Sequence, residues 1–418
     1  MDVTQTENSV AENAAENVVT AEKTGDGKTH ILYLNHVSQI SGAEQSLRAL
    51  LWQFRRAGMD IEPIIALPGG GPFAEMMRDE AWNVTFAPLR RLHRPQGFLD
   101  GMASLVHIFQ TAPFIARLGR QTGAQIIHSN STTSHLVGGL AAEKLRIPAI
   151  WHARDLVSLA KLAPSLAARA AFVIAISQAV AKKLEEDGVP ADKIRTIYNG
   201  LDPDEWYPRD GKSGVQLRET LGADDKTFIF GCAGQLVPWK NHVAFIEAAA
   251  QIAQDENCGN ARFVIMGGDL WGEQQEYVKQ LRALVKQHNL QDRFNFVPHQ
   301  NDAVDALASL DCVVLASHEE PFGRVLMEAM ALEKPVIAYN ENGPSEIVTH
   351  EKDGLLVDPE TENGLAQAMT RVLRDGEMRD VLRLAARQSV IEKFHISDSA
   401  QKIHDLYREV LDAPKASA

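Results

Sequence analysis

Short apolar runs alternate with longer stretches of helical periodicity along the chain from Thr29 onward. The runs suit single buried strands, and the stretches between them are long enough for the helices that connect parallel strands. Because strands that are apolar on both faces occur mainly beneath helices, the alternation predicts parallel sheets covered by helices on both sides. The predicted strands occupy residues 31–34, 61–67, 126–128, 149–151, 172–176, 194–198, 228–233, 263–266, 294–297, 312–315, 336–339 and 355–357.

A polar stretch from residue 202 to 225 interrupts the alternation, which then restarts. We therefore expect an α/β protein with two Rossmann-like domains, residues 28–203 and 204–396, hinged near this stretch. Residues 397–411 place apolar side chains at helical spacing among charged ones, which predicts a last helix that packs on either domain. A cleft between two such domains is the usual ligand site, and its closure would exclude water.

The charge of the chain is unevenly distributed. Residues 1–27 hold six acidic residues against one lysine, a net charge of −5 out of −13, and are predicted to be a disordered acidic tail. The remaining body carries −13 − (−5) = −8, which argues against general nucleic-acid binding. The sequence has no apolar run near about eighteen residues and no basic start followed by an apolar stretch, so neither a membrane span nor a secretion signal is expected.

The three cysteines, Cys232, Cys258 and Cys312, lack the spacing of metal or redox motifs. Two of them fall in predicted strands, so we expect buried free thiols in a reducing compartment. The predicted location is therefore cytoplasmic.

The segment from Glu319 to Glu328 combines features that suit a phosphorylated ligand. Pro321 is typical of the first position of a helix, and Gly323 lets the backbone approach a ligand closely. A helix that begins there would present free N–H groups and the positive end of its dipole to a diphosphate. Glu320 and Glu328 would then lie about 12 Å apart along the helix axis, at a rise of roughly 1.5 Å per residue.

That spacing allows one carboxylate to hold sugar hydroxyls and the other to hold ribose hydroxyls. Acidic residues also favour the first turn of any helix, and two glutamates at this spacing arise by chance. The context favours the functional interpretation, because the segment joins a predicted buried strand to a predicted helix, where open α/β sheets bind ligands.

Two glycine-containing loops follow other strands of the second half. Residues 234–242 begin with Gly234 and contain Lys240, which together would suit a phosphate group, although a lysine after a strand is usually only solvated. Gly267 and Gly268 permit a close approach of ligand to backbone, but glycines are also common in turns.

In the first half, Ser41 and Glu44 have the spacing of a helix capping box, which alone would explain both. Gly42 lies between them, and a glycine in the first turn of a helix is unfavourable for helicity. Its presence suggests that a ligand or another group must come close to the backbone there. His152 ends another predicted strand, where its ring would hydrogen-bond a sugar hydroxyl or serve a structural role.

Residues 90–94 contain Arg90, Arg91, His93 and Arg94, and an apolar helical pattern follows from Phe98. A basic patch beside an apolar helix suits an anionic membrane or a phosphorylated acceptor. A solvated loop before a core helix would produce the same pattern.

Taken together, these segments resemble the retaining glycosyltransferases of family 4, which have the two-domain GT-B fold. The resemblance covers most of residues 29–395 and rests on the order and spacing of segments 41–44, 128–130, 147–152, 177–202, 234–240, 320–328, 343–348 and 354–357.

The resemblance implies transfer of a sugar, with retention at the anomeric carbon, from a UDP-, GDP- or ADP-sugar to a hydroxyl of a saccharide or lipid-linked acceptor. It implies neither a bound metal ion nor another cofactor. In this family the departing phosphate is thought to accept the proton of the acceptor, so a dedicated protein base is not required. Stabilising the leaving diphosphate is then the main catalytic task. Cell-surface polysaccharide or lipopolysaccharide assembly at the inner face of a membrane is the expected setting.

Residue by residue, the resemblance assigns Glu320, with the backbone of Phe322 and Gly323, to the donor sugar, and Glu328 to the ribose. Val325 and Leu326 would offer backbone N–H groups to the diphosphate.

The remaining donor-site assignments come from other loops. Lys240 would offer a charge to the diphosphate, and Gly42 would leave room for it. His152 would contact the sugar at the reacting end, and Pro298 would lie near the base.

One residue departs from the family pattern. Five residues before Lys240, where an arginine is usual, the chain has Gln235, after Gly234. A neutral amide lacks the charge-assisted grip of a guanidinium, so leaving-group stabilisation would be weaker unless Arg324 supplies the charge.

The departure keeps an alternative open, namely a weak or inactive partner subunit of glycosyltransferase type. Retention of Glu320, Glu328, Lys240 and His152 argues against it. An exported sugar-binding protein would also alternate strands and helices, but the missing signal and the diphosphate-suited helix start disfavour it.

Overall fold

The computed structural model describes residues 27–92, 97–207, 213–300 and 302–413. The chain divides into two compact units. Unit 1 comprises the chain up to Gly200 together with the residues from Ile396 on, and unit 2 is Leu201–His395. The predicted acidic tail, apart from Gly27, and residues 93 and 94 of the basic patch lie outside the described residues.

The described part of unit 1 contains a parallel sheet of seven strands, in the order β3-β2-β1-β4-β5-β6-β7. Its strands are β1 (Thr29–Leu34), β2 (Ile61–Leu67), β3 (Asn83–Phe86), β4 (Ile126–Ser129), β5 (Ala149–Ala153), β6 (Phe172–Ala175) and β7 (Ile194–Thr196). The sequence pattern did not predict β3, an edge strand whose residues are exposed or half-buried and therefore lack an apolar run.

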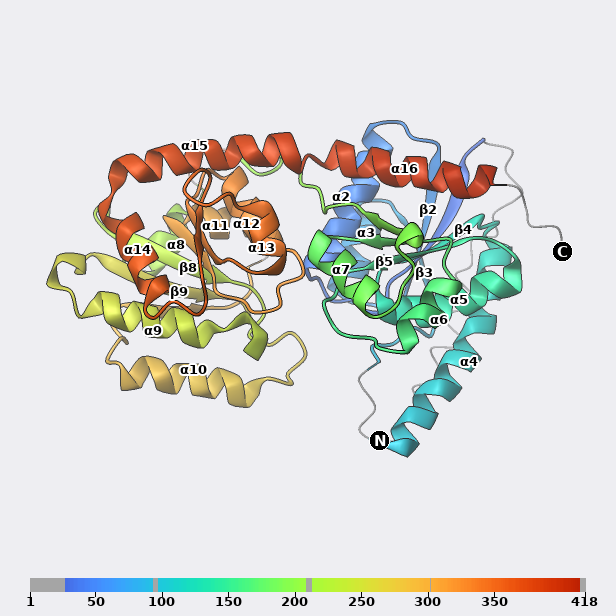
Figure 1. Ribbon diagram of the computed structural model, residues 1–418, viewed down its shortest axis with the longest axis horizontal. Helices are drawn as coiled ribbons and strands as arrows, with labels where there is room; N and C mark the ends of the chain where they lie inside the picture. Colours follow the sequence, from blue (N-terminus) through green and yellow to red (C-terminus); the bar gives the residue numbers. More distant parts are fainter. Residues whose placement is uncertain (1–26, 93–96, 208–212, 301, 414–418) are drawn as a thin grey trace. The chain divides into compact units, whose positions relative to one another are not determined.

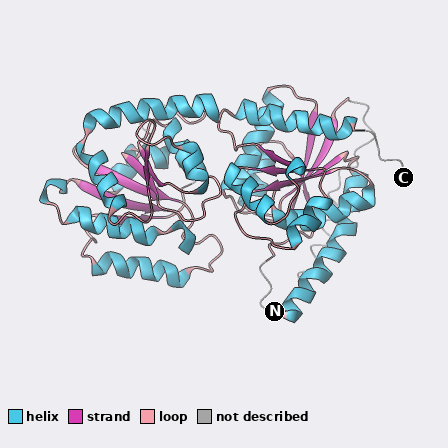
Figure 2. Ribbon diagram, viewed as in Figure 1, coloured by secondary structure: helices cyan, strands magenta, loops and turns pink. Residues whose placement is uncertain are grey.

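Helices cover both faces of this sheet (Figure 2). They are α2 (Gly42–Arg56), α3 (Pro72–Asp79), α4 (Phe98–Gln121), α5 (Thr132–Leu145), α6 (Leu162–Ala168), α7 (Gln178–Glu186) and α16 (Ile396–Asp412), with a 3₁₀ turn η1 (Ala191–Lys193). Alternate residues of β1 point to opposite faces, so Ile31 and Tyr33 pack under α2, α3 and α16, whereas Leu32 and Leu34 pack under α4 and α5.

The last helix, α16, therefore completes the core of unit 1. Its residues Ala400, Ile403, Leu406 and Tyr407 are buried against β1, β4, β5 and α2. Figure 1 shows α16 lying beside α2 although most of the chain separates them in sequence.

Unit 2 has, within its described residues, a parallel sheet of six strands in the order β10-β9-β8-β11-β12-β13. The strands are β8 (Phe228–Ala233), β9 (Ala261–Met266), β10 (Phe294–Val297), β11 (Cys312–Leu315), β12 (Val336–Tyr339) and β13 (Leu355–Val357). The helices are α8 (Val215–Thr220), α9 (His242–Ala253), α10 (Gln275–Gln287), α11 (Ala303–Ala308), α12 (Arg324–Ala331), α13 (Asn342–Ile347), α14 (Gly364–Arg374) and α15 (Gly376–Lys393), with 3₁₀ turns η2 (Pro238–Lys240) and η3 (Glu256–Cys258).

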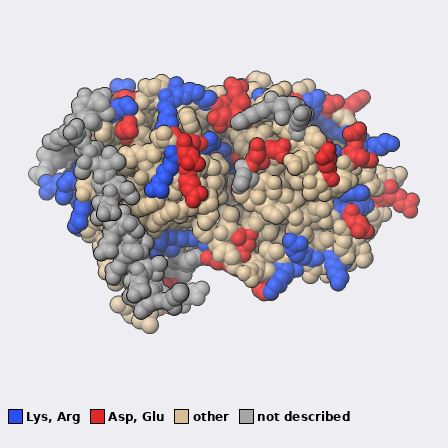
Figure 3. All heavy atoms as spheres, turned by 180° about the vertical axis from the view of Figure 1, so that it is seen from behind, with Lys and Arg blue, Asp and Glu red and all other residues tan. Residues whose placement is uncertain are grey.

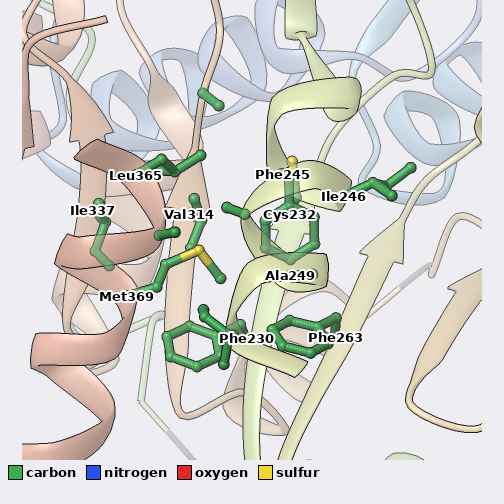
Figure 4. Close-up of a cluster of buried hydrophobic side chains, with 14 of the residues drawn as sticks. Phe230, Cys232, Phe245, Ile246, Ala249, Phe263, Val314, Ile337, Leu365 and Met369 are labelled. Atoms are coloured by element: carbon green, nitrogen blue, oxygen red, sulfur yellow. The ribbon is translucent and has the colours of Figure 1, made fainter. Parts of the chain in front are cut away.

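The core of unit 2 is rich in aromatic rings. Phe230 and Phe263 stack with centroids 6.0 Å apart, and Phe245 meets Phe263 edge-on (Figure 4). Leu365 and Met369 of α14 close the same cluster. The three cysteines are buried and free, as predicted.

Each sheet reverses its strand order once, between β1 and β4 in unit 1 and between β8 and β11 in unit 2. In doubly wound sheets, ligands bind at the carboxyl edge beside such a reversal of strand order. The prediction of an α/β fold with two Rossmann-like domains is confirmed.

No helix in the described stretches of the chain is both long enough and apolar enough to cross a membrane.

Candidate active site

In unit 2, hydrogen bonds hold together the two loops at the reversal point of the sheet. The backbone N–H of His318, after β11, donates to the carbonyl of Trp239, after β8, at 2.9 Å. The Asn241 Nδ2 lies 3.2 Å from His318 Nε2, and the other ring nitrogen of His318 lies 3.2 Å from a carboxylate oxygen of Glu341. Since the amide nitrogen of Asn241 can only donate, His318 accepts at Nε2 and donates from Nδ1.

The same two loops bring Lys240 and Glu320 together. The Lys240 Nζ lies 2.5 Å from a Glu320 carboxylate oxygen, and the two side chains are 14% and 8% exposed. The stem of Lys240 passes over Gly234, where a Cβ would lie 3.6 Å from Lys240 Cε, and its ammonium lies 4.4 Å from the centre of the Trp239 ring. The cation is therefore fixed at the sheet edge rather than solvated on a flexible side chain.

A close backbone contact supports the loop that carries Glu320. Gly343, in the first turn of α13, donates its N–H to the Glu320 carbonyl at 3.1 Å. A Cβ on Gly343 would lie 2.3 Å from Phe322 Cα, so only glycine fits. The Phe322 ring points away into the core, where it meets Phe394 edge-on at 5.9 Å. The segment 343–348 thus shapes the loop of residues 320–323.

The prediction that a helix begins at Pro321 is wrong. Helix α12 begins at Arg324, because Gly323 at its N-cap has φ of 98°, in the left-handed region outside the helix. The distance of about 12 Å between the two glutamates, which assumed a continuous helix at ~1.5 Å per residue, therefore does not apply. Glu320 lies in the loop, and Glu328 lies in the second turn of α12.

Glu328 is paired with Arg324 one turn earlier. The Arg324 Nε donates to a carboxylate oxygen of Glu328 at 2.6 Å, and both side chains are largely buried. Burial raises the pKa of the Glu328 carboxyl, and the Arg324 charge partly opposes this rise. The Leu326 N–H already donates to the Gly323 carbonyl at 2.8 Å, so a diphosphate there would share this donor.

Pro298 and Gln235 lie in other loops of unit 2. Pro298 is exposed after the edge strand β10, and its carbonyl accepts a hydrogen bond from the side chain of Gln300 at 2.9 Å. Gln235 is half-buried after β8, between Gly234 and the buried Leu236.

In unit 1, a chain of buried polar side chains links the loops after β1 and β4. Glu44 accepts hydrogen bonds from the Ser41 N–H and from Asn35 Nδ2, both at 3.0 Å, which supports the predicted capping box. Asn35 Oδ1 accepts from Asn130 Nδ2 at 2.9 Å, and Asn130 Oδ1 accepts from two nitrogens of Arg154 at 3.0 and 2.8 Å. Two amides thus connect a buried carboxylate to a buried guanidinium.

Gly42 is the first residue of α2 and is exposed at this edge of the sheet. The exposed start of a helix of 15 residues offers unpaired N–H groups there, with no Cβ in the way. The position is compatible with the predicted role of Gly42.

His152 lies at the end of β5 beside this network. Its Nδ1 lies 3.1 Å from His128 Nε2 and 3.4 Å from Arg154 Nη2. Burial, followed by the charges of Arg154 and His128, holds the pKa of His152 well below its usual value, so the ring is neutral. Within the described residues, His152 Nε2 is buried and has no hydrogen-bond partner.

The structure therefore joins some predicted residues in pairs, Lys240 with Glu320 and Arg324 with Glu328. Sequence reasoning assigned no site role to Asn35, Arg154 or His318. Arg154 and Asn130 each follow a predicted strand, and the adjacency of β4 and β5 was the signal that would have connected them.

Charged side chains of both signs are mixed over the face of unit 2 seen at the right of Figure 3. On this face the basic side chains do not form a continuous stripe. In the part of the chain that the structure describes, no group of three or more His, Cys, Asp or Glu residues is placed to hold a metal ion.

Comparison with known families decides the identity. The family described as Glycosyl transferases group 1 matches residues 216–389, and that described as Glycosyltransferase Family 4 matches residues 40–205. The chain belongs to the family 4 glycosyltransferases. It is thus an enzyme that transfers a sugar from a nucleotide sugar.

Individual relatives of this glycosyltransferase agree with that identity. It is 26% identical to the UDP-Gal:alpha-D-GlcNAc-diphosphoundecaprenol alpha-1,3-galactosyltransferase of Escherichia coli, over 82% of this chain and 87% of that protein. It is 29% identical to the lipopolysaccharide core biosynthesis glycosyltransferase LpsD of Rhizobium meliloti, over 57% and 63% respectively. The crystal structure of Anabaena Alr3699/HepE in complex with UDP-glucose matches with a TM-score of 0.78 and 25% identity, over 91% of this chain and 99% of that chain.

Proposed function

We propose that this glycosyltransferase transfers a hexose from a UDP-sugar, with retention of configuration, to a lipid-linked saccharide of the cell surface. The observation that carries the proposal is the Lys240–Glu320 pair at the reversal point of the sheet of unit 2. UDP is preferred over GDP and ADP because the Escherichia coli relative is named for UDP-Gal and the Anabaena relative was crystallised with UDP-glucose.

In the proposed complex, Lys240 lies beside the diphosphate and Glu320 accepts hydrogen bonds from hydroxyls of the donor sugar. Their mutual ion pair holds both side chains in place before the donor arrives, which lowers the cost of organising them on binding. The leaving diphosphate gains negative charge as the glycosidic bond breaks, and a fixed cation in a half-buried site stabilises that charge strongly.

Gln235 cannot replace the guanidinium usual at its position, and Arg324 lies at the first residue of α12. We assign Arg324 two tasks. It supplies positive charge near the start of α12, and it keeps the Glu328 carboxyl ionised for the ribose, since it opposes the effect of burial on the pKa of that group.

The acceptor side of the proposal rests on α4. Apolar side chains project from its first half, among them Phe98, Leu99 and Phe109, which are 81%, 80% and 64% exposed. Figure 1 shows this end of α4 extending away from the sheet of unit 1. The exposed Arg90 lies just before the helix and close enough to His107 of α4 to lower the pKa of its ring, after the larger effect of burial.

An apolar helix face beside arginines suits the surface of an anionic membrane, where a lipid-linked acceptor would reside. We therefore propose that the protein is cytoplasmic and binds peripherally to the inner face of the membrane through α4. A polyprenyl or lipopolysaccharide acceptor, as in the names of the two relatives, is consistent with this placement.

A donor screen tests the proposal. The purified protein is heated with UDP-, GDP- and ADP-hexoses, and the true donor should raise the melting temperature in proportion to its concentration. The same donors are then incubated without acceptor, and slow release of nucleotide diphosphate is measured. A higher melting temperature with a UDP-hexose, together with hydrolysis of that donor, supports the proposed transferase activity. Stabilisation without any hydrolysis, and without transfer to lipid extracts, would instead support an inactive partner subunit.

A further inference from the structure

The side chain of His318 joins three loops at the carboxyl edge of the sheet of unit 2. These loops follow β8, β11 and β12, of which β8 and β12 both pair with β11. His318 lies in the loop after β11, and its Nε2 and Nδ1 lie 3.2 Å from Asn241 Nδ2 and 3.2 Å from a carboxylate oxygen of Glu341, respectively. The ring also packs on Tyr339, the last residue of β12, with the ring centroids 5.4 Å apart.

The start of α9 determines the direction of these hydrogen bonds. The Ala244 N–H donates to Asn241 Oδ1 at 3.4 Å, so the oxygen of this amide is used to cap the helix. The amide nitrogen of Asn241 therefore faces His318 and donates to Nε2, and the neutral ring donates from Nδ1 to Glu341. The link thus requires an acceptor at the ε position of residue 318 and a donor at its δ position.

Each end of this link adjoins a residue of the candidate donor site. Asn241 directly follows Lys240 and has a left-handed backbone, with φ of 51°, so the two side chains leave the same tight turn. Glu341 lies two residues before Gly343, whose N–H donates to the Glu320 carbonyl. A hydrogen-bonded side chain therefore connects the loop of Lys240 with the loops that hold Glu320.

The direct ion pair between Lys240 and Glu320 serves the same purpose only until the donor binds. The two side chains are assigned to different parts of the donor, so their contact of 2.5 Å opens as each turns to its own partner. The atoms that join the loops through His318 have no assigned contact with the donor, and their hydrogen bonds persist. The backbone bond from the His318 N–H to the Trp239 carbonyl keeps the loops adjacent but orients no side chain.

We propose that His318 is a positioning residue whose Nε2 holds Asn241, and with it Lys240, in place while the donor is bound. The inference rests on the proposed function for the role of Lys240. It gives His318 a part in turnover without any contact between its side chain and the donor.

Two amide substitutions separate the two halves of the link. In His318→Gln, the side-chain oxygen reaches the ε position and can accept from Asn241, while the bond to Glu341 is lost. In His318→Asn, the amide nitrogen reaches the δ position and can donate to Glu341, while Asn241 loses its acceptor. Both variants keep the backbone bond of residue 318, and the histidine side chain is 48% exposed, so neither change disturbs the core. Melting temperatures monitor folding.

Amide hydrogen exchange of residues 234–242 is measured first, in the unliganded full chain. Exchange in this segment should be about five- to tenfold faster in His318→Asn, as for one lost hydrogen bond, and close to the wild-type rate in His318→Gln. Turnover of the UDP-hexose should follow the same order. It should fall about five- to tenfold in His318→Asn, with a smaller change in the KM for the donor, and His318→Gln should keep most of it.

A double-mutant cycle connects the effect to Lys240. If His318 acts through this lysine, His318→Asn should cause no further fall in turnover in the Lys240→Ala background. An equal fall in both backgrounds would overturn the inference, because it would show a general effect on the loops. Equal effects of His318→Asn and His318→Gln, or wild-type exchange and turnover in His318→Asn, would overturn it as well.

Hydrogen exchange requires no substrate, so this result is separate from the proposed function. If no nucleotide sugar is bound or consumed but the exchange rates behave as expected, the proposed function fails and the hold of His318 on the loop of Lys240 stands. If transfer occurs but neither exchange nor turnover distinguishes the two variants, the positioning inference alone is overturned.

Discussion

Arg324 and Glu328 form an ion pair of 2.6 Å on one face of α12, with both side chains largely buried. Arg324 is the residue proposed to supply the positive charge that Gln235 lacks, and Glu328 is the carboxylate assigned to the ribose. The ion pair therefore links these two proposed roles. A single substitution at Arg324 should therefore affect both donor binding and turnover.

We predict that Arg324→Ala lowers turnover about as much as Lys240→Ala, on the order of 100-fold, because each change removes a cation assigned to the leaving diphosphate. Arg324→Ala should also raise the KM for the donor, since Glu328 loses its partner. Steady-state kinetics with the UDP-hexose measure both quantities. Arg383→Ala, at an exposed ion pair on α15, is the control and should leave the rate unchanged. Wild-type turnover in Arg324→Ala would refute the compensation for Gln235.

The loop of residues 320–323 should be sensitive to a single methyl group on Gly343. Gly343→Ala places a Cβ 2.3 Å from Phe322 Cα, so the loop must shift, at a cost of about 1–3 kcal/mol in the free energy of unfolding. We expect a large loss of donor affinity in calorimetry. Gly376→Ala, at the start of α15, is the control because a Cβ there meets only the end of the flexible Arg379 side chain, at 3.4 Å. Equal donor affinity in the two variants would contradict the supporting role of Gly343.

Acid should destabilise unit 1 through its buried histidines. Burial lowers the pKa of His128 to about 3 and of His135 to about 4, below the ordinary value of 6.5 in the unfolded chain. A depressed pKa means that the unfolded chain binds the proton first, so stability is present above pH 6.5 and is lost as the pH falls. Between pH 6.5 and pH 5, each histidine should remove about 2 kcal/mol from the free energy of unfolding.

Urea denaturation at several pH values checks this slope. His135→Phe keeps a ring beside Trp151, on which His135 stacks, and removes one titrating group. The variant should therefore show a shallower loss of stability with falling pH, whatever its stability at pH 7. An identical slope in wild type and variant would show that His135 does not contribute.

Membrane binding should depend on the exposed face of α4. The double change Phe98→Ser and Phe109→Ser removes two large apolar side chains from this face. Full burial of each contributes about 1.5–3 kcal/mol of free energy. The affinity for anionic vesicles should therefore fall at least about tenfold. Sedimentation with phosphatidylglycerol vesicles measures the binding. The control is Val381→Ser with Leu384→Ser, since these residues of α15 are also exposed, at 63% and 56%. Similar losses in the two double variants would refute a specific role of α4.

Much of the fold was predictable because it depends on patterns local to the sequence. Buried strands such as β8 and β11 appear as apolar runs, and their order along the chain implies a parallel sheet with helical connections. The start of α12 was predicted wrongly because Pro321 and Gly323 both signal a helix boundary. The choice between them was decided by the backbone of Gly323, whose φ of 98° lies in the left-handed region and so places it outside the helix.

The arrangement of the site could be predicted less well from the sequence, because it depends on residues that come together only in the folded protein. The residue types of Lys240 and Glu320 suggested a donor site, but their pairing required the adjacency of β8 and β11. In the sequence, Tyr407 was only one of several apolar positions of an amphipathic helix. Its contact with His128, 279 positions away, has no local signature.

The position of α16 in the core of unit 1 also orders events during synthesis. All of unit 2, from Leu201 to His395, leaves the ribosome before Ile403, Leu406 and Tyr407 are available to cover β1 and α2. Unit 2 is one continuous segment and can fold while unit 1 still exposes part of its sheet. Unit 2 should therefore fold first, and α16 should then complete the core of unit 1 and bring Tyr407 to His128.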